Sequence, residues 1–207
     1  PREALSFAIG IEILAFVWLW FFVNFLSAVL ATSACLFYVF IYSLWLKRSS
    51  TSNIVIGGAA GAVPVLIGWS SVTNSLDWPP IILFLLIFLW TPPHFWALAI
   101  HRKDEYKKAE IPMLPVTHGT AFTRIQILLY TVLLFLVTML PYLTGMSGVI
   151  YLICSASLGL LFLGYSIKIL LEPENTLIAF KTFKYSINYL LVLFVGLLVD
   201  HYLLMTF

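Results

Sequence analysis

The chain has 207 residues, of which 62% are hydrophobic and 10% are charged, and its formal net charge is +2. A soluble globular domain carries charge on about 25% of its residues, so this composition excludes an ordinary soluble domain. A membrane helix needs roughly 20 apolar residues, and the chain therefore has room for about seven spans. The small net charge gives no reason to expect a nucleic-acid partner; the expected environment is a lipid bilayer.

Seven long apolar runs predict an all-α, polytopic transmembrane bundle. None of them alternates in the way that a barrel strand does. The first two runs are nearly continuous, and we separate them at Asn24 because some 40 apolar residues would overrun one bilayer. The predicted spans are 4–22, 25–45, 54–72, 79–100, 121–141, 148–171 and 185–204.

Lysine and arginine fall at every second connection between these spans. The positive-inside rule then places the basic connections and the beginning of the chain on the cytoplasmic or mitochondrial-matrix side, and the end of the chain on the opposite side. We expect a multi-pass protein of a bacterial or mitochondrial inner membrane. The basic residues are Arg2, Lys47, Arg48, Arg102, Lys103, Lys107, Lys108, Arg124, Lys168, Lys181 and Lys184.

Small residues and prolines indicate where helices pack closely or bend. The segment "IVIGGAAGAVPVLIGW" (54–69) places Gly57 and Gly61 four residues apart, a spacing that lets helix backbones approach each other in lipid. Prolines kink helices or begin them, and broken backbone at membrane depth is tolerated chiefly beside protein or a cavity. An internal cavity is therefore expected near Pro64, Pro79, Pro92 and Pro93.

The first polar connection is "LKRSSTSN" (46–53), which follows the second span. Lys47 and Arg48 are typical topology anchors at a helix end. The hydroxyl groups of residues 49–52 and the amide of Asn53 follow at once, and cations beside such groups can also seat a phosphate. Both interpretations remain open from the residues alone.

The second polar connection begins inside the span that contains "WTPPHFWALAIHRKDEY" (90–106). If the helix continues past Ile100, then His94, His101 and Glu105 project onto nearly one face, and His94 lies roughly 16 Å from Glu105. Histidine within a span usually faces a bundle interior. His94 is therefore expected either to make an interhelical hydrogen bond or to serve a site, whereas His101 is expected at the membrane interface.

Asp104 and Glu105 are the candidate metal ligands. A carboxylate beside an apolar cavity can bind a hard divalent cation, typically Mg²⁺, which retains water and bridges phosphates. Asp104 could instead form a weak surface ion pair with Lys108, four residues later. The helical-face argument favours Glu105 over Asp104.

The other unusual residues have simpler explanations. Cys35 and Cys154 lack any metal-binding spacing and are expected to be small buried hydrophobic residues. Asp200, near the end of the last span, is expected to be structural. Glu12 and Asn24 lie in apolar surroundings and receive no role.

Three segments carry a resemblance to a known family: "LKRSSTSNIVIGGAAGAVPVLIGW", "FLWTPPHFWALAIHRKDEYKKAEIPMLPV" and "FKYSINYLLVLFVGLLVD". They resemble the protohaem IX farnesyltransferase (haem O synthase) family of UbiA-type intramembrane prenyltransferases. The resemblance extends over essentially all 207 residues.

The resemblance implies a nine-helix fold whose central cavity lies beneath two acidic cytoplasmic loops. It also implies that farnesyl diphosphate is the donor, that haem B is the acceptor, and that Mg²⁺ accompanies the diphosphate. Haem O, a precursor for haem-copper oxidases, would be the product, and haem A synthase or other oxidase-assembly proteins would be candidate partners. The residues implied around the diphosphate and metal are Lys47, Arg48, Asn53, Arg102, Asp104, Glu105 and Tyr106, with His94 lining the haem pocket.

Two departures from the family pattern matter. The first Asn/Asp-rich motif has no counterpart, so residues 1–207 are expected to be one membrane domain that begins at the third family helix and is inactive by itself. In the second motif, Glu105 stands in place of an aspartate, with Asp104 beside it. Two residues after the Asp-Tyr pair the family usually reads Ala-Gly or Ala-Asn, whereas this chain reads Ala109-Glu110.

Two alternative functions remain. One is an aromatic-ring prenyltransferase of quinone synthesis, which would keep the fold and change the acceptor. The other is a transporter or a non-enzymatic assembly protein, because intramembrane charges and broken helices also occur in transporters. The sequence shows no clear internal repeat, which disfavours the transporter.

Overall fold

The computed structural model describes residues 2–204 and contains no strand in that range. The prediction of an all-α fold is confirmed, and seven helical segments are long and apolar enough to cross a membrane, as expected. The elements in chain order are α1 (Arg2–Phe22), α2 (Phe25–Leu36), the π-helix η1 (Phe37–Leu46), α3 (Lys47–Ser49), α4 (Asn53–Thr73), α5 (Trp78–His101), α6 (Lys103–Lys108), α7 (Leu114–Thr117), α8 (Gly119–Thr138), α9 (Leu140–Leu143), α10 (Val149–Leu171) and α11 (Thr176–Leu204).

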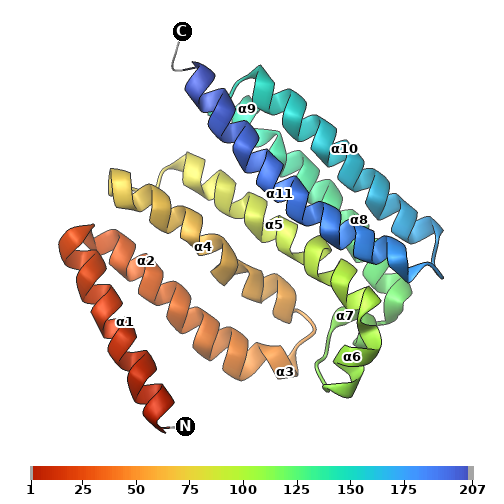
Figure 1. Ribbon diagram of the computed structural model, residues 1–207, viewed down its shortest axis with the longest axis horizontal. Helices are drawn as coiled ribbons and strands as arrows, with labels where there is room; N and C mark the ends of the chain where they lie inside the picture. The colour runs from red at the N-terminus through yellow and green to blue at the C-terminus, as the bar shows by residue number, and fades with distance from the viewer. Residues whose placement is uncertain (1, 205–207) are drawn as a thin grey trace.

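The last four spans form a four-helix bundle, and the first three extend from it as a row. In the bundle α5 packs against α8 and α11, and α10 packs against the same two helices. All four helices contribute to two apolar clusters in its core, one of which consists of Leu86, Leu134, Tyr151, Phe162, Tyr189 and Leu193. The row continues from α5 through α4 to α2, and α1 lies at the outer edge (Figure 1).

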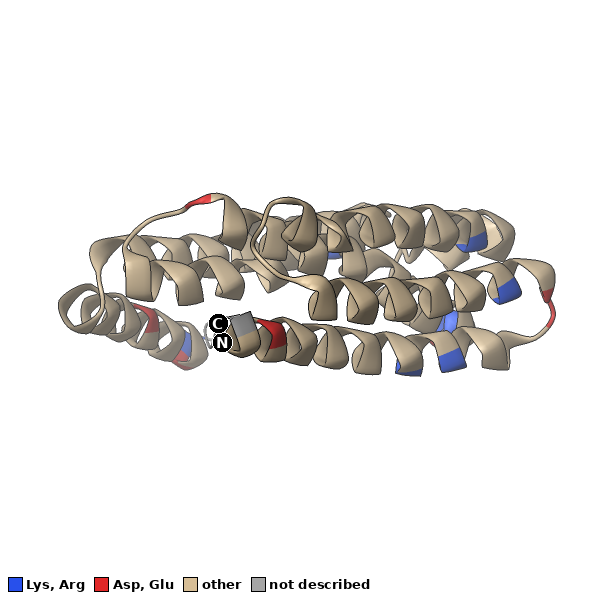
Figure 2. Ribbon diagram, turned by 90° about the horizontal axis from the view of Figure 1, so that it is seen from above, with Lys and Arg blue, Asp and Glu red and all other residues tan. Residues whose placement is uncertain are grey.

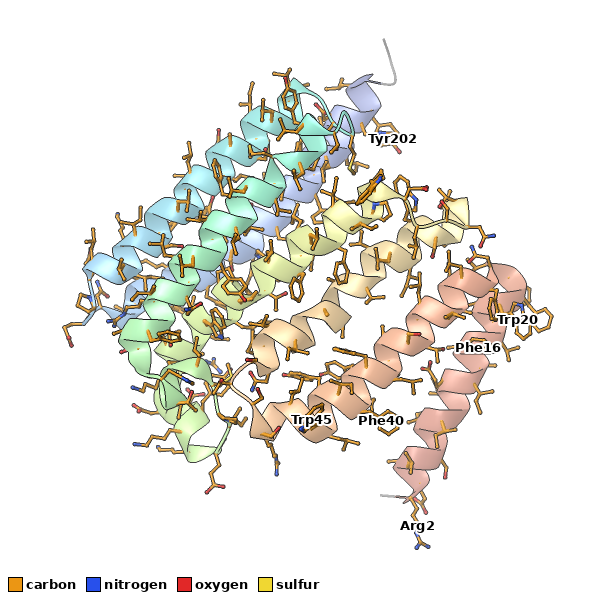
Figure 3. All side chains as sticks on the ribbon, turned by 180° about the vertical axis from the view of Figure 1, so that it is seen from behind. Arg2, Phe16, Trp20, Phe40, Trp45 and Tyr202 are labelled. Carbon is orange, nitrogen blue, oxygen red and sulfur yellow. The ribbon has the colours of Figure 1, made fainter. Side chains whose placement is uncertain are left out.

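The turn at Asn24 confirms the boundary between the first two spans. Asn24 is the N-cap of α2: its side-chain oxygen accepts a hydrogen bond of 2.8 Å from the Ser27 backbone, and its Nδ2 donates to the Ser70 carbonyl at 2.6 Å. The cap thus ends α1, begins α2 and ties the turn to α4. Figure 3 shows Phe16 and Trp20 at the end of α1 that meets α2, whereas Arg2 stands at the opposite end.

The two ends of the bundle differ in charge. The N- and C-terminal ends of the chain lie at opposite ends of the helices (Figure 1), and most of the visible lysine and arginine positions gather towards one end (Figure 2). One detail of the prediction is wrong. The last span begins at Thr176 and not at 185, so Lys181 and Lys184 lie on α11 and not in a connection. Lys184 illustrates the reason, since its Nζ lies 4.6 Å from the Phe180 ring centre while its stem follows the helix surface.

The second span is not a uniform α-helix. Its middle section, η1, is a ten-residue π-helix, which the apolar pattern of the span does not indicate. A π-helix turns more widely than an α-helix and often occurs at functional sites. Tyr38 and Tyr42 lie on this section, and both line the cavity described next.

Candidate functional site

An apolar cavity of about 260 Å³ lies between η1, α4 and α5. Its wall consists mainly of aromatic rings, aliphatic side chains and glycine backbone, which suits a hydrocarbon chain. Ile54 lines the cavity and directly follows Asn53 in the chain, so the cavity wall continues into the end of the polar connection 47–53. The lining residues are Tyr38, Tyr42, Ile54, Gly57, Gly58, Gly61, Ile87, Trp90, Thr91 and Phe95.

Glycine residues of α4 create this space. A Cβ at Gly57 would collide with the Tyr42 ring, and one at Gly58 would lie 3.0 Å from Thr91 Cγ2. At Gly61 there is no neighbouring atom within 4 Å, because this residue faces the cavity. Side chains, and not a neighbouring helix backbone, therefore fill the space beside Gly57 and Gly58, and the close packing predicted at Gly61 is wrong.

The prolines lie inside helices or in their first turns, as predicted. Pro79 is in the first turn of α5, and Pro64 lies inside α4. Pro92 and Pro93 are buried inside α5, next to the cavity residue Thr91. Because proline has no N–H, the carbonyl groups four residues earlier lose their helical donors. The carbonyl groups of Phe88 and Leu89 thus lack these donors in α5.

The connection 47–53 is held by Asn53. Lys47 and Arg48 are exposed on α3, whereas Asn53, the first residue of α4, is 1% exposed. The Asn53 Nδ2 donates to the Lys47 carbonyl at 3.4 Å, and the Asn53 Oδ1 has no partner among the described residues. The buried amide therefore fixes the backbone beneath the two cations and leaves one acceptor unused.

The helix that carries His94 does not continue past residue 101. It ends at His101, Arg102 adopts φ −104° and ψ 27°, and α6 begins at Lys103. The prediction that His94, His101 and Glu105 share one continuous helical face is therefore wrong, because Arg102 turns the chain between the second histidine and the carboxylate.

The same turn changes the expected ion pair. Arg102 Nη1 lies 3.6 Å from Glu105 Oε2, with the two side chains 52% and 70% exposed. Within residues 2–204 no ion pair joins Asp104 to Lys108, so that alternative is wrong. Glu105 is thus the carboxylate that stands beside a cation in this part of the structure.

An apolar cluster brings the two polar connections to the same end of the bundle. Ile54 of α4 is buried in it, and Tyr106 of α6 packs against it. Met113 and Leu114, at the start of α7, are buried in the same cluster. Consistent with this, α3 and α6 lie at the same end in Figure 1. We call residues 47–53 and 102–110 together the polar cap.

His94 makes the interhelical hydrogen bond that was one of its two predicted roles. Its Nδ1 lies 2.6 Å from Ser186 Oγ of α11, and its ring stacks on Trp90 with centroids 4.2 Å apart. Trp90 in turn lines the cavity. His101, the last residue of α5, stacks on Phe180 at 4.7 Å, and its buried Nδ1 has no partner among the described residues.

The carboxylates of the cap suit a metal that takes most of its ligands from elsewhere. Across residues 2–204 there is no group of three or more His, Cys, Asp or Glu that could enclose a metal ion. Mg²⁺ does not need one, since it commonly binds through one or two carboxylates, several waters and substrate phosphates. Asp104 and Glu105, both exposed on α6, fit this requirement.

A larger cavity, of about 550 Å³, lies at the opposite end of the bundle. Its described lining residues include no lysine or arginine, so this cavity lacks the cations that would hold a phosphate. Its lining is Trp69, Pro79, Leu83, Met146, Phe194, Leu197, Leu198 and His201. The described lining of the smaller cavity holds no lysine or arginine either, and the smaller cavity is favoured because Ile54 in its wall directly follows the polar connection 47–53.

Several site residues were not singled out from the sequence. Tyr38, Tyr42 and Thr91 line the cavity, and Ser186 contacts His94. Each is an isolated polar group in an apolar run, where hydroxyl groups can also bond to their own helix. The sequence therefore gave no signal that they differ from the other hydroxyl residues of the spans.

Cys35, Cys154 and Asp200 take no part in this site. Both cysteines are free and half-buried, on α2 and α10. Asp200 is 1% exposed and accepts hydrogen bonds from Ser147 Oγ, at 2.6 Å, and from backbone groups at the start of α10. Its predicted structural role is confirmed.

These features define a multi-pass helical membrane protein with an apolar cavity beside a cap of cations and carboxylates. The family model described as "UbiA prenyltransferase family" matches residues 1–188. The chain belongs to the UbiA prenyltransferase family.

Individual relatives are similar over almost the whole chain. "Protoheme IX farnesyltransferase" of Vesicomyosocius okutanii is 52% identical over 207 residues, covering 99% of this chain and 69% of the relative. The protein of the same name from Alcanivorax borkumensis is 53% identical, covering 100% and 68%. A solved structure of digeranylgeranylglyceryl phosphate synthase has a TM-score of 0.80 and 25% identity, covering 96% of this chain and 69% of that one.

Proposed function

We propose that this protein transfers a farnesyl group from farnesyl diphosphate to a vinyl group of haem B, giving haem O. The observation that carries the proposal is the identity of 52–54% with proteins named protoheme IX farnesyltransferase, over 97–100% of the chain. The cavity beside the polar cap supports it, because a prenyl diphosphate has an apolar tail and a charged head. Residues 1–207 form one integral-membrane domain in this proposal, and the activity is that of the full-length protein.

The donor is proposed to lie with its tail in the cavity and its diphosphate at the polar cap. Lys47, Arg48 and Arg102 supply positive charge for the departing diphosphate, which stabilises the negative charge that develops as the carbon–oxygen bond breaks. Asn53 holds the connection that carries the first two cations. Tyr106, half-buried on α6, offers a hydroxyl group beside Glu105 in sequence.

A Mg²⁺ ion would be held by Glu105, with Asp104 as the neighbouring carboxylate, and by the diphosphate itself. When bound, such an ion neutralises charge on the leaving group. Glu105 is exposed and paired with Arg102 at 3.6 Å, so the same carboxylate both orients a phosphate-binding cation and offers a metal ligand.

Haem B is proposed to approach the face of α5 that carries Trp90 and His94. The allylic carbon–oxygen bond breaks and its electron pair leaves with the diphosphate. The terminal vinyl carbon bonds to the allylic carbon, and water adds to the other vinyl carbon with loss of one proton. The product carries a hydroxyethylfarnesyl side chain, and the cavity keeps bulk water away from the allylic carbon until that bond has formed.

We also propose the orientation and the surroundings of the protein. The polar cap faces the cytoplasm or the mitochondrial matrix, and the C-terminal end faces the opposite side, in accordance with the positive-inside rule. Haem A synthase and other oxidase-assembly proteins are the proposed protein partners, because they act next on haem O.

The test supplies full-length protein in lipid nanodiscs with farnesyl diphosphate, Mg²⁺ and haem B, with an aromatic quinone precursor as a competing acceptor. Liquid chromatography with mass spectrometry should detect haem O and no prenylated aromatic compound. Prenylation of the quinone precursor alone would reject haem as the acceptor. Movement of a ligand across liposomes without Mg²⁺ and without chemical change would favour a transporter.

A further inference from the structure

Ser186 of α11 holds two aromatic side chains of α5. Its side chain is fully buried, and its Oγ lies 2.6 Å from His94 Nδ1. Its backbone carbonyl accepts a hydrogen bond of 2.9 Å from Trp90 Nε1. One residue thus fixes both Trp90, which lines the cavity, and His94, which stacks on Trp90.

The hydrogen bonds around Ser186 determine which nitrogen of His94 carries the proton. Ser186 Oγ also lies 2.7 Å from the Phe183 carbonyl oxygen. A carbonyl oxygen has no hydrogen, so the single hydroxyl hydrogen of Ser186 must bridge this pair. The contact with His94 then needs a hydrogen from the imidazole. His94 therefore donates from Nδ1, and in the neutral ring Nε2 carries the lone pair.

The surroundings hold the ring in that orientation. His94 is 8% exposed, and its ring lies between Trp90, at 4.2 Å, and Phe183, at 4.6 Å, with Phe95 edge-on at 5.0 Å. None of these neighbours would balance an imidazolium charge. Nε2 makes no hydrogen bond with any described residue. The Nε2 lone pair is therefore not used by any residue that the structure describes.

We propose that Ser186 is a positioning residue, which fixes His94 as the Nδ1–H tautomer so that Nε2 can bind the iron of the acceptor haem. The inference rests on the proposed function, because it needs haem as the acceptor. Neutral imidazole nitrogen is a common ligand of haem iron, and a hydrogen bond from the other ring nitrogen fixes the orientation and raises the basicity of the ligand. Ser186 itself touches no reacting atom.

The tautomer is tested without haem. Nitrogen-15 NMR of protein labelled at histidine distinguishes a protonated Nδ1 from a protonated Nε2, and His94→Gln assigns the signal among the four histidines. The expected result is a neutral His94 ring with the proton on Nδ1. A proton on Nε2 would overturn the inference whatever the enzyme does.

The effect on iron is tested by resonance Raman spectroscopy of ferrous haem B bound to the full-length protein in nanodiscs. The unaltered protein should show an iron–histidine stretching band that His94→Gln abolishes. Ser186→Ala should shift this band to lower frequency, and Ser186→Thr should restore it. Haem O formation by Ser186→Ala should fall roughly 10–100-fold, as is typical when the residue that supports a metal ligand is removed.

A matched control is Ser166→Ala. Ser166 is also fully buried, donates to the carbonyl of Phe162 at 3.0 Å and bonds across helices to Thr131 at 2.9 Å, but it lies away from His94. Its loss should leave the band unchanged. The role of Ser186 would be overturned if the unaltered protein made haem O but showed no iron–histidine band. It would also be overturned if Ser186→Ala showed the same band as the unaltered protein. Failure of the unaltered protein to make haem O would reject the proposed function instead.

Discussion

The guanidinium group of Arg102 lies 3.6 Å from the carboxylate of Glu105, across the bend that separates α5 from α6. Both side chains are more than half exposed, so the pair contributes little to stability. The pair lies at the same end of the bundle as α3, which carries Lys47 and Arg48 (Figure 1), and this is the arrangement that the proposed binding of a diphosphate requires.

The first prediction concerns this carboxylate. Glu105→Gln should lower the rate of farnesyl transfer roughly 100-fold, because a ligand for the metal-bound diphosphate is lost. The thermal unfolding midpoint should hardly change, since the side chain is exposed. Initial rates at saturating Mg²⁺ and unfolding followed by circular dichroism would measure both. Glu174→Gln, an exposed carboxylate between α10 and α11, is the control. If Asp104→Asn lowered the transfer rate more than Glu105→Gln did, Asp104 would be the metal ligand.

The second prediction concerns the cavity. Gly61→Leu should raise the KM for farnesyl diphosphate roughly 10-fold, because the new side chain occupies space that the prenyl tail needs. Geranyl diphosphate, which is shorter, should be affected less. Gly68→Leu is a matched control, because Gly68 lies on the same helix with equally open surroundings and does not line the cavity. Equal KM values for farnesyl diphosphate in the two variants would show that this cavity does not bind the prenyl tail.

The third prediction concerns stability at the opposite end of the bundle. Asp200→Ala should lower the free energy of unfolding by about 3 kcal/mol, because it leaves the Ser147 hydroxyl and the N–H groups of Gly148 and Tyr151 unpaired. Unfolding in mixed detergent micelles would measure the loss. Asp77→Asn, at an exposed aspartate that pairs with Ser75, should change it by less than about 0.5 kcal/mol. Similar values for both variants would contradict the structural role of Asp200.

The fourth prediction concerns Glu110, which has a positive φ of 54° in the polar cap. This left-handed conformation disfavours most side chains and is accessible to asparagine and glycine, the residues expected there from the family resemblance. Glu110→Asn should raise the free energy of unfolding by about 1 kcal/mol. The same unfolding assay applies, with Glu172→Asn as a control at a residue of negative φ. No stabilisation would contradict this backbone geometry.

The spans and the polar cap could be predicted from the sequence for a simple reason. Each span is an apolar run close to the length that crosses a bilayer, and charged residues are few enough to stand out. Lys47, Arg48 and Glu105 were identifiable for that reason, although their roles stay predictions. The same use of charged residues to mark the ends of spans predicted too late a start for α11, because Lys181 and Lys184 can lie on a helix while their charges reach water.

The remaining features depend on contacts that no local pattern records. The π-helix η1 is apolar throughout, as an α-helical span would be, so hydrophobicity could not distinguish the two. The bend at Arg102 occurs in a charged segment that is compatible with a continuous helix. Ser186 resembles the other buried serines of the spans until the position of His94 is known.

The central claim is that the apolar cavity and the polar cap form one site for a prenyl diphosphate. Photo-crosslinking with a farnesyl diphosphate analogue that carries a photoreactive group on its tail tests this claim most directly, with mass spectrometry to locate the modified residues. The account predicts labelling of the cavity wall on η1, α4 and α5, at residues such as Tyr42 and Ile87, that excess farnesyl diphosphate suppresses. Labelling concentrated instead at the opposite end, around Trp69 and Leu197, would contradict it.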